Sequence, residues 1–87
     1  SNKAKVEYSL SWLYLNDKSV KNRDLGLQYL ESSANNGEVE SEFLLGEIYE
    51  KGELLPKDLS KSQYWYNKAT NQGMEEAMEK VKNYKSN

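Results

Sequence analysis

Carboxylates are the side chains in this sequence with the greatest capacity for chemistry, and six of them lie in one segment of sixteen residues. These are Glu38, Glu40, Glu42, Glu47, Glu50 and Glu53. Paired carboxylates can act as general acid and base, and clustered ones can bind calcium. However, the sequence around them lacks the apolar setting that shifts a carboxyl pKa, and no D-x-D-x-D-G calcium loop is present.

Other chemistry is excluded by residue type. The chain has neither His nor Cys, so imidazole bases, thiol nucleophiles and the usual zinc ligands are missing. The five glycines are dispersed and form no phosphate-binding loop. The sequence therefore predicts a protein that is not an enzyme. We therefore expect no catalytic residue, metal site, cofactor or small-molecule substrate.

The acidic segment predicts a binding role instead. Lys51 is the only basic residue among the six glutamates, and this sign bias favours a basic protein or peptide partner through electrostatic steering. The candidate partner-binding glutamates are Glu40, Glu42 and Glu47. The alternative is a solvated helix face, with the first glutamates favoured locally by the helix dipole.

Three other residues are candidate contacts. Trp12 and Leu44 fall where the pattern described below predicts outward-facing positions, and with Glu47 they can form one concave strip. Alternatively, Trp12 packs against the N-terminal edge or a preceding repeat. Tyr64, on the fourth predicted helix, either binds a partner or covers its neighbours.

These residues must be positioned by a repeated element. Five residues from Val6 to Tyr14 match the residues 35 positions later, and seven from Asn22 to Gly37 match those 36 positions later. A period near 36 with two helical patterns per unit predicts stacked helical hairpins, an all-α solenoid. We expect one domain over residues 1–87, with repeat one at about 3–37, repeat two at 38–73 and a capping helix at 74–87.

Apolar spacing and turn residues predict the helix limits. We expect helices at about 3–16, 23–36, 39–51, 59–72 and 74–84. Asn22 and Asp58 are the predicted N-caps of the second and fourth helices, and Gly37 and Gly73 are predicted to have positive φ at C′ positions. Trp65 is predicted to lie in the core, and Trp12 to be incompletely buried. The connector leucines, Leu54 and Leu55, are expected to tuck under the hairpin.

The second unit resembles a Sel1-like repeat, a relative of the tetratricopeptide repeat. Its Leu45-Gly46, Trp65-Tyr66 and Gln72-Gly73 pairs match the family's signature, as do single residues between them. Three positions depart from the pattern, at Leu54, Ser62 and Thr70, and the first unit is more degenerate. The resemblance implies two helical hairpins plus a C-terminal capping helix, and a protein-binding adaptor or scaffold.

Composition sets the remaining limits. A net charge of −2 gives no bulk attraction for nucleic acid or anionic membrane, and no apolar run is long enough to span a membrane. The absence of Cys is compatible with both bacterial cytoplasm and periplasm. The alternative function is a small stand-alone inhibitor, such as a bacterial immunity protein that neutralises a toxin.

Overall fold

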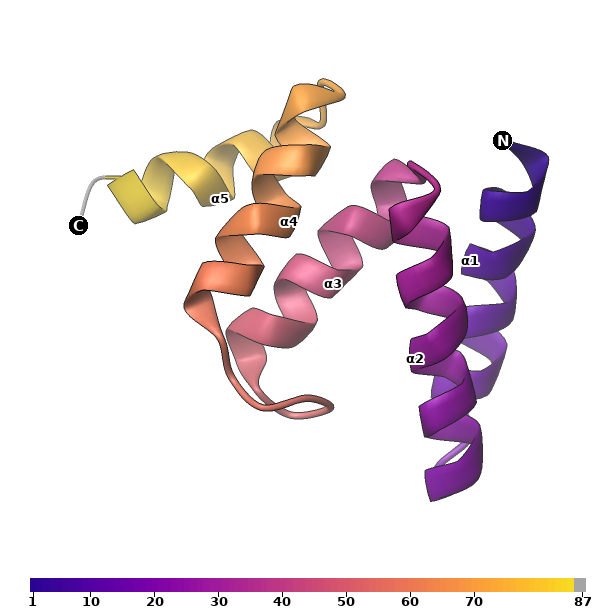
Figure 1. Cartoon of the computed structure of the whole chain (residues 1–87). Helices are drawn as coiled ribbons and strands as arrows, with labels where there is room; N and C mark the ends of the chain where they lie inside the picture. Colours follow the sequence, from indigo (N-terminus) through magenta and orange to yellow (C-terminus); the bar gives the residue numbers. More distant parts are fainter. Residues whose placement is uncertain (86–87) are drawn as a thin grey trace. The chain divides into compact units, whose positions relative to one another are not determined.

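The described part of the chain folds into five α-helices. The computed structural model describes residues 1–85 of the 87-residue chain, and this range contains no strand. Figure 1 shows the helices, which are α1 (Asn2–Leu15), α2 (Val20–Asn35), α3 (Val39–Lys51), α4 (Leu59–Asn71) and α5 (Glu75–Lys85). The predicted all-α architecture of five helices is confirmed. Residues 86 and 87, which the predicted capping helix included, lie outside the described residues.

The helices form two compact units. The first comprises residues Ser1–Ser41, in which α1 and α2 pack as an antiparallel hairpin (Figure 1). The second begins at Glu42, in the first turn of α3, and contains the packing of α4 against α5.

Helix α1 buries small and polar residues rather than its large apolar ones. Ala4, Glu7 and Ser11, spaced three and four residues apart, form its buried face. Small side chains suit this face because they let two helices approach closely. Val6 and Leu13 lie on the opposite side and are 57% and 69% exposed.

Helix α2 begins three residues earlier than predicted, because Ser19 and not Asn22 is its N-cap. The Ser19 hydroxyl accepts a hydrogen bond from the Asn22 backbone N–H at 3.2 Å. Asp17 braces this turn by accepting from the Ser19 N–H at 2.9 Å and from the Asn22 side chain at 2.8 Å. These bonds, that from the Ser19 backbone above all, lower the pKa of Asp17.

The predicted helix stops are confirmed. Gly37 and Gly73 each follow the C-cap of a helix, and both have φ of 89°. A Cβ added at either position would meet no atom within 4 Å, so a side chain there would be opposed by backbone conformation alone.

The core of the second unit is built on Tyr66, not on the neighbouring Trp65. Tyr66 is fully buried with Ser62 and Ala69, which lie at helical spacing on the same face of α4, whereas Trp65 is half-buried. The prediction that Trp65 lies in the core is therefore wrong, because one residue along a helix turns a side chain by about 100°. The Tyr66 ring reaches α3 at Gly46, where a Cβ would stand 2.6 Å from it.

The connector between α3 and α4 follows the prediction in part. Asp58 is the N-cap of α4 and accepts from the Lys61 N–H at 3.0 Å. Leu55 is half-buried, whereas Leu54 is exposed and does not tuck under the hairpin.

Candidate partner-binding surfaces

The glutamates of α3 are not a uniform acidic surface. Glu42, a predicted partner-binding residue, is 2% exposed, and the Gln72 side chain donates to its Oε1 at 2.9 Å. Because the carboxyl group is buried and held by this bond, it is not placed to contact a partner directly, contrary to the prediction for Glu42. Glu38, just before the helix, is also buried and lies 3.7 Å from the Lys5 ammonium group.

Glu50 also serves the interior of its own unit. It accepts a hydrogen bond from the Tyr66 hydroxyl at 2.6 Å and another from the Lys80 ammonium at 3.0 Å. Burial opposes ionisation of Glu50, but these two bonds and the charge of Lys80 outweigh it and lower its pKa. Burial, followed by the bond to Glu50, raises the pKa of Tyr66.

The predicted strip of Trp12, Leu44 and Glu47 is divided between the two units. Trp12 belongs to the first unit, whereas Leu44 and Glu47 belong to the second and are half-buried. The strip stays a prediction. Glu40, in the first unit, is exposed, as expected for a residue that contacts a partner.

Trp12 lies on an exposed apolar side of α1. Its side chain is 46% exposed, as predicted, and its ring packs edge-to-face against Tyr8, with 6.5 Å between centroids. Val6 and Leu13 add exposed apolar area to the same helix. We call Val6, Trp12 and Leu13 the α1 apolar surface. Sequence analysis found Trp12 but did not single out the other two, whose helical spacing was equally compatible with a buried face.

Tyr64 is exposed on α4. It is 55% exposed and packs edge-to-face against Trp65 at 5.0 Å, while the Lys68 ammonium lies 5.9 Å from its ring centroid. Its neighbours thus orient the ring without burying it, and it stays a candidate contact in the second unit.

Sequence analysis missed a groove between α1 and α2 that contains a buried carboxylate. Glu7 is 9% exposed, and its Oε2 accepts a hydrogen bond from the Ser32 hydroxyl at 2.7 Å, while Asn36 approaches its Oε1 at 3.4 Å. The groove has a volume of about 280 Å³ and is lined by Glu7, Leu25, Gln28, Tyr29 and Ser32. Repeat symmetry contained a signal, because Glu7 precedes Glu42 by one repeat of 35 residues.

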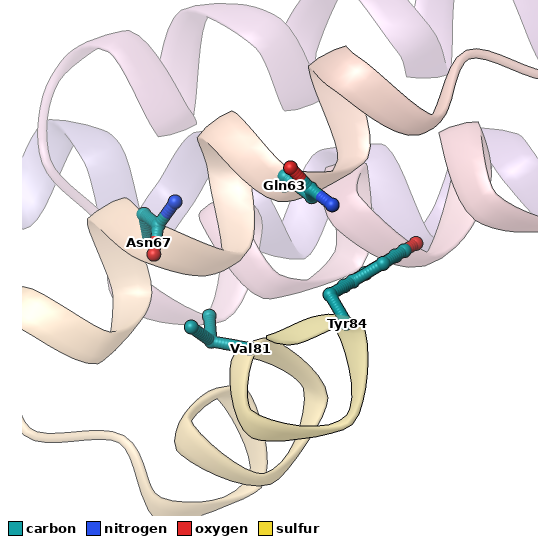
Figure 2. A pocket seen from close by; sticks show the side chains of 4 residues that line it. All are labelled: Gln63, Asn67, Val81 and Tyr84. Atoms are coloured by element: carbon teal, nitrogen blue, oxygen red, sulfur yellow. The ribbon is translucent and has the colours of Figure 1, made fainter. Parts of the chain in front are cut away.

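Two smaller pockets lie in the second unit. Figure 2 shows the first, of about 100 Å³, in which Gln63 and Asn67 of α4 face Val81 and Tyr84 of α5. The Tyr84 hydroxyl lies 3.3 Å from that of Ser62. The second has a volume of about 150 Å³ and is lined by Glu50, Lys80, Asn83 and Tyr84. Its two charges neutralise each other, and both pockets are too small for a drug-sized ligand.

Residues 1–85 contain no group of three or more acidic residues arranged to hold a metal ion. Within the same range, no helix combines the length and apolar character needed to cross a membrane.

The family of this chain is shown by a match to a protein-family model. The family model of the Sel1 repeat matches residues 4–38 and 39–74. The chain belongs to the Sel1 repeat family. Proteins of this family generally act as protein–protein interaction modules and are typically non-catalytic scaffolds.

Solved Sel1 repeat structures share the fold. A Sel1 repeat protein from Oxalobacter formigenes is 31% identical over 92% of this chain, with a TM-score of 0.80. A protective antigen of uropathogenic Escherichia coli strains, described as displaying this repeat fold, is 26% identical over 90% of the chain, with a TM-score of 0.81. The matches span 61% and 17% of those two proteins. No curated protein matches this chain.

Proposed function

We propose that this chain is a non-catalytic module, an adaptor or scaffold, that binds a protein partner through the α1 apolar surface. The observation that carries the proposal is the exposure of Val6, Trp12 and Leu13, at 57%, 46% and 69%. Single exposed apolar residues are normal, but here Val6 and Leu13 share one side of α1 and Trp12 lies about 100° around the helix from Leu13, so apolar side chains are presented over much of its exposed face. Membership of the Sel1 repeat family supports this role.

Trp12 is the proposed anchor. Its edge-to-face contact with Tyr8 limits the conformations of the indole before a partner arrives, so little side-chain entropy is lost on binding. Buried Trp side chains are frequent hot spots, and surrounding apolar side chains exclude water from them.

The remaining exposed charge adjusts the association rate. Glu40 is exposed in the first unit, whereas Glu47 is half-buried in the second. A basic partner surface would approach such carboxylates faster at low salt, with little change in the rate of dissociation. Glu42 has no part in this steering because it is buried.

The test begins with capture of a partner on the immobilised chain and its identification by mass spectrometry. Surface plasmon resonance with the purified partner then compares Trp12→Ala and Leu13→Ala with wild type. We expect Trp12→Ala to weaken binding by about 2 kcal/mol or more, mainly through faster dissociation. Tyr64→Ala, which truncates an exposed aromatic residue in the second unit, is the matched control. Circular dichroism verifies that each variant is folded.

Each contrary outcome has a defined meaning. Unchanged binding by both α1 variants would contradict the proposal, and a loss with Tyr64→Ala alone would move the site to α4. Self-association that Trp12→Ala abolishes, without a second protein, would replace the partner by another copy of this chain.

A further inference from the structure

The groove between α1 and α2 has an unusual combination of groups for a surface depression. It is lined by Glu7, which is 9% exposed, together with the apolar Leu25, the aromatic Tyr29 and the exposed Gln28. Tyr29 is held in place by stacking on Tyr14, with centroids 5.7 Å apart and the ring planes within 9° of parallel. A carboxylate and an oriented aromatic ring thus line the same depression.

The charge of Glu7 is not neutralised within the described residues. Its hydrogen-bond donors are the neutral side chains of Ser32 and Asn36, and the second of these bonds is long, at 3.4 Å. No described Lys or Arg side chain forms a salt bridge with Glu7, and Lys5, two residues away, pairs with Glu38 instead. A buried carboxylate without a cation gains from one more than an exposed carboxylate does.

The second repeat carries cations at the positions that correspond to this groove. One repeat of 36 residues after Leu25 and Ser32 come Lys61 and Lys68. Lys61 lies 5.4 Å from the ring centroid of Tyr49, and Lys68 lies 5.9 Å from that of Tyr64. The second repeat thus places cations over Tyr49 and Tyr64, which correspond to Tyr14 and Gln28, whereas within the described residues no cation lies over Tyr29 or pairs with Glu7.

We propose that the groove takes an arginine side chain that the protein partner presents. This inference rests on the proposed partner-binding function and names the chemistry that the partner supplies. The guanidinium would bind the Glu7 carboxylate and the Gln28 carbonyl oxygen, while its flat face packs on Tyr29 and its alkyl part on Leu25. Arginine fits better than lysine because the guanidinium is planar, weakly hydrated and able to make two parallel hydrogen bonds to a carboxylate.

The proposal is tested without the partner, by NMR titration of the isotope-labelled chain with Nα-acetyl-L-arginine N-methylamide. We expect saturable shifts at Glu7, Gln28 and Tyr29, with a dissociation constant on the order of millimolar for one side chain. The equally capped citrulline, which has the same shape but no charge, should give no saturable shift. Capped lysine should bind more weakly than capped arginine, and free arginine should bind no better than the capped form.

Two glutamate variants provide matched changes in the two repeats. Glu7→Gln keeps an oxygen for the Ser32 hydroxyl but removes the charge, and we expect it to weaken capped-arginine binding at least about tenfold. Glu42→Gln makes the same change at the corresponding buried position and should leave binding unchanged. If Glu7→Gln does not fold, Gln28→Lys, at an exposed position, places a competing cation over the groove and should abolish the shifts.

The outcomes separate this inference from the proposed function. Equal shifts with citrulline, equal binding by Glu7→Gln, or no saturable shift at these residues would overturn the arginine site. Tighter binding of capped lysine would replace arginine by lysine as the occupant, and tighter binding of free arginine would replace a protein side chain by the free amino acid. None of these results affects partner binding through Trp12. Conversely, a chain that binds capped arginine but captures no partner would leave the groove in place and contradict the proposed function.

Discussion

The two repeats place a carboxylate at the same position and use it differently. Glu7 and Glu42 are 35 residues apart, and each faces an amide side chain near the end of the following helix. In the second repeat Gln72 reaches the carboxylate at 2.9 Å. In the first repeat Asn36, one methylene shorter, stays at 3.4 Å, and a groove is present beside the carboxylate. One methylene thus distinguishes a short amide bond from a long one, and the carboxylate of the first repeat is held chiefly by the Ser32 hydroxyl at 2.7 Å.

The cores of the two repeats also differ in size. Leu30 and Tyr66 occupy corresponding positions and are both fully buried. The Tyr66 ring is accommodated because Gly46 lacks a Cβ, whereas the first repeat carries Ser11 at the corresponding position. The comparison teaches that a larger side chain on one helix requires a smaller one on the other, as close packing demands.

The largest expected effect is loss of the second repeat's core. Tyr66→Ala should reduce the free energy of unfolding by about 3–5 kcal/mol, because it removes a fully buried ring. Leu30→Ala should cost about 2–5 kcal/mol in the first repeat, and Trp65→Ala less than about 3 kcal/mol because the indole is half-buried. Urea denaturation followed by circular dichroism measures all three. A larger loss for Trp65→Ala than for Tyr66→Ala would contradict this assignment of the core.

The next largest effect is expected at Gly46, whose missing side chain leaves room for the Tyr66 ring. Gly46→Ala places a Cβ 2.6 Å from the Tyr66 ring and should destabilise the chain by about 1–3 kcal/mol. In a Tyr66→Leu background, which imitates the first repeat, the same substitution should cost much less. A double-mutant cycle measured by urea denaturation tests this coupling. Equal costs in the two backgrounds would show that the ring does not set the size limit.

The helix stops are expected to behave alike in both repeats. Gly37→Ala and Gly73→Ala should each cost on the order of 1 kcal/mol, because both glycines have φ of 89° and neither substitution meets a neighbouring atom. Thermal unfolding of the two variants, measured beside wild type, provides the comparison. A loss confined to one of the two sites would break the equivalence.

The smallest effect is the pH dependence that Glu50 contributes to the stability of the second repeat. The folded state lowers the pKa of Glu50, so its stabilisation is fully present above about pH 4.5 and decreases as the pH falls towards the folded-state pKa. We expect a contribution below about 1 kcal/mol, because the Glu50 side chain is a third exposed and solvent screens it. Urea denaturation of wild type and of Glu50→Gln between pH 3 and pH 7 isolates the contribution of Glu50 to the free energy of unfolding. An unchanged pH profile in the variant would assign the dependence to other carboxyls.

Sequence reasoning predicted the helices well because periodicity and glycine stops are local signals. The start of α2 was misplaced because Ser19 and Asn22 are both good caps, and the bracing by Asp17 decides between them. The sequence did not show which ring of the Trp65-Tyr66 pair is buried. Tyr66 is buried because Gly46, on another helix, has no side chain and leaves room for its ring.

The candidate site was predicted less well than the fold. In the sequence, Glu42 does not differ from the other acidic residues of α3, because its hydrogen-bond partner Gln72 lies thirty residues later. Burial of Glu7 was not predicted for the same reason, since its partners Ser32 and Asn36 also lie far along the chain. Burial of a carboxylate depends on tertiary contacts, which charge patterning along a helix does not reveal.

The central claim is that the first repeat, and not the second, carries the contacts that hold the partner, while Glu40 and Glu47 affect only the association rate. Calorimetric titration of the purified partner into four variants tests it most directly, with Trp12→Ala and Glu7→Gln paired against Tyr64→Ala and Glu42→Gln. We predict that each first-repeat change weakens the affinity at least about tenfold, or about 1.4 kcal/mol, while the second-repeat changes leave it within error. Weakening by Tyr64→Ala or Glu42→Gln, with wild-type affinity for both first-repeat variants, would contradict the claim.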